Sequence, residues 1–181
     1  MAGIIIPYRG ITPKISKDAF IAENAVIIGD VEIGPGTSIW YNCVIRGDVK
    51  SIRIGSDTNI QDGTIIHVNH DRTGGDYRET GGGIPTHIGN GVTVGHMALL
   101  HACDIRGNSF IGMRSVVMDK AIVETNAMVA AGALVTPGKV VPTGELWSGS
   151  PAKKFRDLKP SEISEITYSA ENYKKLGKSY S

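Results

Sequence analysis

Isoleucine, valine or leucine recurs at intervals of six residues through most of this chain. The recurring positions form four runs: Ile21, Ile27, Ile33, Ile39 and Ile45; Ile54, Ile60 and Ile66; Ile88, Val94 and Leu100; and Ile105, Ile111, Val117, Val123, Val129 and Val135. Four residues after most of them stands a small or β-branched residue, such as Ala25, Thr37 or Cys43. In extended chain, side chains two residues apart point to the same side. The pattern therefore predicts repeated short strands whose inward face carries one large and one small side chain.

A six-residue repeat of this regularity predicts a β-helix, in which short strands stack coil upon coil. Three strands per coil would build a triangular prism of about five to six coils that rise by about 4.8 Å each. The 23 glycines and the low aromatic content agree with short strands separated by turns. The repeat by itself does not give the handedness of the coil.

A different pattern begins after the last hexads. Pro160 and Ser161 form a helix-start signal. An apolar stripe at helical spacing follows, made of Ile163, Ile166, Ala170, Tyr173 and Leu176. We therefore predict a β-helix over residues 1–157 and a C-terminal α-helix over residues 158–181 that packs along the prism.

The hexad repeat is interrupted at several points, and in a solenoid such interruptions are where loops and functional sites tend to lie. The longest interruption, residues 70–87, is a polar, glycine-rich insertion that carries the titratable residues His70, Asp76 and Glu79. It is either a solvated loop or a wall over a site.

Counting in hexads places two histidines in one outward column. His67 follows Ile66 and His101 follows Leu100, and three hexads separate the two. Because three strands make one coil, His67 and His101 should lie on neighbouring rungs of one face, with Arg46 one rung earlier. Imidazoles on adjacent rungs can share a metal ion at about 2.0–2.1 Å per nitrogen. The alternative is that both are ordinary outward polar side chains.

His96 belongs to a second column, with Asp62, on the preceding face. The extended chain from His96 to His101 reaches about 16 Å, so His96 is not expected to join His67 and His101 within one chain. A neighbouring chain could supply it, because three prisms around a three-fold axis meet through three equal heterologous contacts. The register therefore predicts a homotrimer with metal sites between its chains.

Charge and cysteine content narrow the range of partners. The chain has 19 Lys plus Arg against 18 Asp plus Glu and no basic run, so we expect no nucleic-acid partner. No apolar stretch is long enough to span a bilayer, and residues 1–7 are too short for a secretory signal, so we expect no membrane association. Two cysteines alone, Cys43 and Cys103, fit a reducing compartment. These features predict a cytoplasmic protein.

One set of ordered motifs resembles the γ-carbonic anhydrase family. The set consists of Arg46-Gly47-Asp48, Asn59, Gln61-Asp62, His67, His96 and His101. The hexads between about Ile15 and Pro151 also resemble the left-handed β-helix of hexapeptide-repeat proteins, and the left hand is implied by that resemblance alone.

The resemblance implies a metal-dependent enzyme that hydrates CO₂ reversibly to bicarbonate. It implies that His67, His96 and His101 bind Zn²⁺ or Fe²⁺, one ion per subunit interface, with ligands from two chains. It further implies that Arg46 and Asp48 form ion pairs at the trimer interface. By the same resemblance, Gln61 hydrogen-bonds metal-bound solvent and Asp62 orients the site.

Two accessory positions depart from the family pattern. Val49 stands where the archetypal enzyme has a glutamate after the interface aspartate. Glu79 or His70 is our candidate substitute for the family's proton-shuttle glutamate. Tyr168 is the candidate for a tyrosine that approaches the metal pocket, although it could equally pack the helix.

Two other functions remain open from the sequence. The same β-helix hosts CoA-dependent acyltransferases, in which a histidine acts as general base. The chain could also be a non-catalytic metal-binding trimer, and Val49 motivates that alternative.

Overall fold

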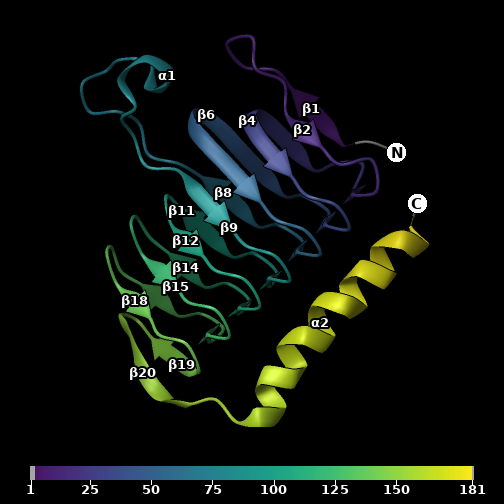
Figure 1. Cartoon of the computed structure of the whole chain (residues 1–181), viewed down its shortest axis with the longest axis vertical. Helices are drawn as coiled ribbons and strands as arrows, with labels where there is room; N and C mark the ends of the chain where they lie inside the picture. The colour runs from purple at the N-terminus through teal and green to yellow at the C-terminus, as the bar shows by residue number, and fades with distance from the viewer. Residues whose placement is uncertain (1–2, 181) are drawn as a thin grey trace.

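The predicted hexads form short parallel strands that stack in register on three faces of a prism. The computed structural model describes residues 3–180 (Figure 1). Face 1 consists of β1 (Ile4–Ile6), the first half of β4 (Val26–Ile33), the first half of β6 (Val44–Ile54), β8 (Ile65–His67), β11 (Leu99–His101), β14 (Val116–Val117) and β17 (Leu134–Val135). Strands β4 and β6 are long enough to turn the corner into the next face.

Face 2 consists of β2 (Lys14–Ile15), the second halves of β4 and β6, β9 (Thr86–Ile88), β12 (Asp104–Ile105), β15 (Ile122–Val123) and β18 (Val140–Val141). Face 3 consists of β3 (Phe20–Ile21), β5 (Ser38–Ile39), β7 (Asn59–Ile60), β10 (Thr93–Val94), β13 (Phe110–Ile111), β16 (Met128–Val129), β19 (Glu145–Gly149) and, antiparallel at its end, β20 (Ala152–Asp157). The prism has more coils than the predicted five to six, because β1, β2, β18 and β19 extend the stack beyond the counted hexads.

The prism interior is filled as the repeat predicted. Ile27, Ile45, Ile66 and Leu100 are fully buried, and small residues such as Ala25 are buried beside them. Several buried threonines and serines, such as Thr37, Thr64 and Ser115, donate to backbone carbonyls, and among residues 3–180 no buried side-chain nitrogen or oxygen lacks a partner. The interior is therefore a continuous, satisfied core, and functional side chains must lie on the outer surface.

Helix α2 (Pro160–Ser179) runs along the prism and covers part of face 3, where it contacts β5, β7 and β10 (Figure 1). Ile166, Ala170 and Gly177 are its buried residues, whereas Leu176 of the predicted stripe is 39% exposed. A Cβ on Gly177 would stand 3.2 Å from that of Phe20, so glycine permits the close approach of the helix end. No helix in residues 3–180 is long and apolar enough to cross a membrane.

The insertion at residues 70–87 contains a short helix, α1 (Tyr77–Thr80), and its neck is closed by the Asn69–Ile84 bridge. The Tyr77 hydroxyl donates to Asp30 at 2.7 Å, and the Lys50 ammonium donates to the Gly82 carbonyl at 2.6 Å. Burial and the Asp30 carboxylate raise the pKa of Tyr77 to about 12, so this bond keeps its proton. The insertion is thus anchored to β4 and β6.

Candidate metal centre

His67 and His101 form a directly paired couple on face 1. The pairing of β8 with β11 puts the two residues opposite each other, as the hexad count predicted. His67 Nδ1 lies 3.3 Å from His101 Nε2, and both rings are partly exposed on the outer surface. The pairing of β6 with β8 sets Arg46 on the preceding rung.

The other nitrogen of each ring is held by a carboxylate. His67 Nε2 lies 2.9 Å from an Asp48 oxygen, and His101 Nδ1 lies 2.6 Å from an Asp119 oxygen. The carboxylates favour the tautomer in which each ring donates its N–H to an acid, and in that tautomer an unprotonated nitrogen of each ring faces the other ring. Carboxylates on the outer nitrogen are the usual way in which metal-binding histidines are oriented.

This geometry fits a tetrahedral metal ion. Two nitrogens bound at about 2.0–2.1 Å to a tetrahedral ion stand about 3.4 Å apart, close to the observed 3.3 Å. Burial lowers the pKa of His67, outweighing the opposite effect of Asp48, and so favours the neutral imidazole that a metal requires. The pair can therefore serve as two ligands of one ion.

The acids that hold the rings are themselves fixed as anions. Burial tends to raise the pKa of Asp48, but the hydrogen bonds from His67 and Arg46 outweigh it and the pKa is lowered. Burial likewise tends to raise the pKa of Asp119, but its hydrogen bonds to His101 and Asn69 outweigh this effect and the pKa is lowered. Asn69 donates to the second Asp119 oxygen at 2.5 Å.

Sequence reasoning missed Asp119 and Asn69. Asp119 lies two positions after Val117, in the hexad one coil beyond that of Leu100 and His101, so register counting could have found it. Asn69 had no such signal, because it begins the insertion and only the folded neck brings its side chain to Asp119.

His96 lies at the corner between face 3 and face 1, apart from the pair. Its Nδ1 is 2.8 Å from Asp62, whose other oxygen accepts from the Tyr41 backbone N–H at 3.2 Å. No group of three or more His, Cys, Asp or Glu side chains within residues 3–180 is arranged to hold a metal. One chain therefore offers two histidines at one place and a third, also held by a carboxylate, at another.

Gln61 is 5% exposed on face 3 and donates its amide to the Asn59 oxygen at 3.0 Å. Asn59 in turn donates to Thr93, and Thr93 donates to Ser169 of α2. Within one chain Gln61 thus belongs to a network under α2 that does not contact His67 or His101. Its predicted role on metal-bound solvent stays a prediction.

Glu79 and Tyr168 lie on exposed surfaces of the chain. Glu79 is on the exposed side of α1 and makes no side-chain hydrogen bond or ion pair within residues 3–180. Tyr168 is 60% exposed on α2, whereas Tyr173 of the same helix packs on Trp40, with ring centroids 5.6 Å apart. His70 is exposed as well, but it lines one small cavity with Asp48 and another cavity with Asp119.

The outer surface of face 1 is apolar beside the histidine pair. Strand pairing aligns one outward aliphatic residue on each rung: Ile4, Val26, Val44, Ile65, Leu99, Val116 and Leu134. We call this set the aliphatic column. Ile65 is 46% and Leu99 is 37% exposed.

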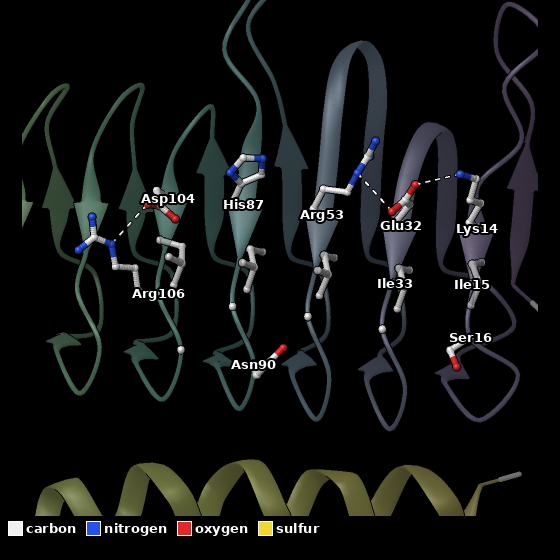
Figure 2. Close-up of a pocket in the computed structure, with 17 residues that line it drawn as sticks. Lys14, Ile15, Ser16, Glu32, Ile33, Arg53, His87, Asn90, Asp104 and Arg106 are labelled. Atoms are coloured by element: carbon white, nitrogen blue, oxygen red, sulfur yellow. Dashed lines mark hydrogen bonds and ion pairs between the residues drawn. The ribbon is translucent and has the colours of Figure 1, made fainter.

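The corresponding positions on face 2 are mostly polar. Figure 2 shows Lys14, Glu32, Arg53, His87 and Asp104 side by side above a shallow hollow, with Glu32 paired to both Lys14 and Arg53. Face 3 is covered in part by α2. Face 1 is therefore the uncovered apolar face of the chain.

Comparisons with known proteins agree with this architecture. The family described as bacterial transferase hexapeptide (six repeats) matches residues 12–47. The solved structure of a hexapeptide transferase family protein from Anaplasma phagocytophilum superimposes with a TM-score of 0.89 at 46% identity and covers 100% of both chains. This likeness confirms the predicted left-handed β-helix with a C-terminal helix.

Two curated relatives are named carbonic anhydrases, and one of them is named a gamma carbonic anhydrase. The mitochondrial gamma carbonic anhydrase 2 of Arabidopsis thaliana is 46% identical over 162 residues, which span 90% of this chain and 56% of the plant protein. The carbonic anhydrase of Geobacillus kaustophilus is 46% identical over 177 residues, 98% of this chain and 91% of that protein. This chain therefore belongs to the γ-carbonic anhydrase family of hexapeptide-repeat proteins.

Proposed function

We propose that the protein is a carbonic anhydrase, which hydrates CO₂ to bicarbonate at a metal site shared between two chains of a homotrimer. His67 and His101 of one chain would hold the ion, Zn²⁺ or Fe²⁺, and His96 of the next chain would complete the ligand set. The observation that carries the proposal is the convergence of two imidazole nitrogens 3.3 Å apart, with the other nitrogen of each ring beside a carboxylate.

A divalent ion held by three neutral imidazoles keeps its full charge and supplies Lewis acidity and an activated water at neutral pH. The residues of the chain prepare that site. Asp48, Asp119 and Asp62 each accept the outer N–H of one histidine and so fix which nitrogen faces the ion. Burial lowers the pKa of His67, which favours the unprotonated ring that a metal ion binds.

Turnover also needs a group that accepts the proton released by water. His70 is a better candidate than Glu79, because His70 lines one cavity with Asp48 and another with Asp119, the two acids that bond to the histidine pair. We therefore propose His70 as the proton acceptor.

The aliphatic column supports the trimer. In a monomer the aliphatic column would be exposed to water beside a metal site with only two of its three proposed ligands. Burial against another chain would remove the unfavourable free energy of that exposure. The corner that carries His96 also carries Met97 and Met113, which are 63% and 53% exposed. Packing of this corner on the aliphatic column of the next chain would bring His96 to the histidine pair. Arg46 and Asp48, which form an ion pair within one chain, lie at the same surface and would border that contact.

Stopped-flow CO₂ hydration is the first test, on protein loaded with Zn²⁺ or, without oxygen, with Fe²⁺. We expect activity well above that of His101→Ala, which removes one ligand without touching the core. Activity equal to that control, with metal confirmed bound in the unsubstituted protein, would reject the assignment.

A mixing experiment tests whether the site is shared. His96→Ala and His101→Ala should each be inactive alone, but refolded together at equal amounts they should regain about a quarter of the full activity, because about one interface in four pairs an intact His96 with an intact His67–His101 couple. A mixture of His67→Ala with His101→Ala should stay inactive, because no chain then keeps both paired histidines. Recovery in that control would contradict the shared site.

Two alternatives rest on separate observations. The Anaplasma protein is named a hexapeptide transferase family protein, so binding of CoA to metal-free protein would favour an acyltransferase. Val49 and the exposed Glu79 favour a non-catalytic metal-binding trimer, and metal bound tightly without hydration activity would favour that function.

Cys43 and Cys103 are buried and unpaired, which fits the cytoplasmic location that we propose.

A further inference from the structure

Both ends of the insertion are bonded to the histidine pair or to its holders. At the first end, Asn69 Nδ2 donates to an Asp119 oxygen at 2.5 Å, and the other oxygen of that carboxylate bonds to His101. At the second end, the hydroxyl of the fully buried Thr86 donates to the His67 carbonyl at 2.6 Å. The insertion is therefore tied to His67 through the backbone and to His101 through a chain of two side chains.

The three acids that bond to the histidines share one arrangement. In each of them one oxygen bonds to the histidine ring, and the other oxygen accepts a hydrogen bond from a second donor. The second donor is the Arg46 guanidinium for Asp48, the Tyr41 backbone N–H for Asp62 and the Asn69 amide for Asp119. Because a carboxylate held at both oxygens cannot rotate freely, each second donor fixes how the acid faces its histidine.

The neck of the insertion is closed without the Asn69 side chain. The Asn69 N–H donates to the Ile84 carbonyl at 3.0 Å, and the Ile84 N–H donates to the Asn69 carbonyl at 2.9 Å. Gly83 has a φ of +78°, and a Cβ on it would lie 2.7 Å from the Asn69 carbonyl oxygen, so glycine permits this close approach. Since the backbone forms the neck, the bond from the Asn69 amide to Asp119 has a separate effect, which is to hold that carboxylate.

We infer that Asn69 is a positioning residue, through which the insertion determines which nitrogen of His101 faces His67. Without the Asn69 amide, the Asp119 carboxylate loses one of its two bonds and can turn away from His101 Nδ1. The His101 proton is then free to move to Nε2, the nitrogen nearest to His67. A protonated nitrogen cannot bind a metal ion. This last consequence rests on the proposed function, whereas the effect on the ring does not.

The test is made first on metal-free protein with ¹⁵N-labelled histidine, at a pH well above the usual histidine pKa of about 6.5. Long-range ¹H–¹⁵N spectra report which ring nitrogen carries the proton. In the unsubstituted protein we expect His101 to be protonated at Nδ1 and unprotonated at Nε2. In Asn69→Ala the two nitrogen signals of His101 should shift toward each other, because the proton exchanges between the two nitrogens. The signals of His96, whose acid is held by a backbone N–H, should stay unchanged.

Two control variants separate the Asn69 bond from a general loosening of the chain. Tyr77→Phe removes the hydroxyl that anchors the insertion to β4 but keeps Asn69. Asn90→Ala removes an exposed asparagine at the corner between faces 2 and 3 (Figure 2). Both variants should leave the His101 signals as they are in the unsubstituted protein.

Unchanged His101 signals in Asn69→Ala, or an equal shift in Tyr77→Phe, would overturn the inference. A shift of the His96 signals as large as that of His101 would show no specific link from Asn69 to His101 and would also overturn it.

The second measurement is Zn²⁺ affinity, determined by competition with a chromophoric chelator. Asn69→Ala should bind Zn²⁺ about tenfold more weakly than Asn90→Ala, because groups that orient a metal ligand typically contribute at least that factor. If the unsubstituted protein bound no Zn²⁺ and hydrated no CO₂, the proposed function would fail. The ring signals of the metal-free variants would still support or overturn the positioning role of Asn69.

Discussion

At the scale of single residues, each of the three histidines has a ring nitrogen within hydrogen-bond distance of an aspartate. Hexad counting predicted the face and the rung of His67, His96 and His101, because each hexad contributes one strand and so fixes the rung that a residue occupies. Asp119 lies in the same hexad count, so its rung could have been predicted, but only the folded chain shows that its carboxylate bonds to His101. Its bond at 2.6 Å is a result of packing.

Asp119→Asn should weaken Zn²⁺ binding by about 10–100-fold, because the amide no longer accepts the His101 N–H as a carboxylate does. The affinity is measured by competition with a chromophoric chelator, and the absorption spectrum of Co²⁺-loaded protein reports the ligand geometry. Asp104→Asn is the matched control, because Asp104 pairs with Arg106 on face 2, where its strand neighbour is His87 and not one of the three proposed ligands. Equal affinities in both variants would mean that Asp119 does not orient His101.

The lowered pKa of His67 makes the folding stability depend on pH in a definite direction. Because the folded chain binds this proton less well than the unfolded chain does, His67 contributes stability above the unfolded pKa of about 6.5, and that contribution is lost as the pH falls. In metal-free protein, NMR titration of the ring signal that disappears in His67→Gln should give a pKa below 6.5. A value above 6.5 would show that Asp48 outweighs burial.

At the scale of elements, the strands could be predicted because each one is defined by a few residues that are adjacent in the sequence. The position of the insertion could not be predicted, because its anchors Asp30 and Lys50 lie far away in the sequence. Sequence reasoning named Glu79 as the site residue, with His70 as the alternative. Both side chains are exposed in the folded chain, but His70 lines one cavity with Asp48 and another with Asp119.

Helix α2 should depend on its buried contacts with face 3. Ile166 is fully buried, so Ile166→Ala should lower the free energy of unfolding by about 2–5 kcal/mol. Tyr168→Ala, on the exposed side of the same helix, should change it by less than about 0.5 kcal/mol. Denaturant unfolding measures both, and a similar loss in the two variants would show that α2 is not held by its apolar face.

At the scale of the whole molecule, the three faces differ in what covers them. Face 3 carries α2, face 2 carries paired charges (Figure 2), and face 1 carries the aliphatic column beside the histidine pair. This asymmetry makes face 1 the surface that we expect to contact another chain.

Leu99→Asp should dissociate the proposed trimer, because it puts a charge into the aliphatic column. Val140→Asp is the matched control, since Val140 occupies the equivalent position on face 2 and is 40% exposed against 37% for Leu99. Light scattering coupled to size exclusion should give three times the chain mass of 19.3 kDa for the control and less for Leu99→Asp. Equal masses would exclude face 1 as the interface.

The sequence by itself determined the β-helix, the C-terminal helix and the neighbouring rungs of His67 and His101, because a six-residue repeat converts sequence separation directly into position. Only the tertiary structure decided which acid holds which imidazole, where the insertion lies, and which face stays apolar and uncovered. Those outcomes depend on contacts between residues distant in sequence, such as Asn69 with Asp119 or Tyr77 with Asp30, and no periodic pattern encodes such contacts.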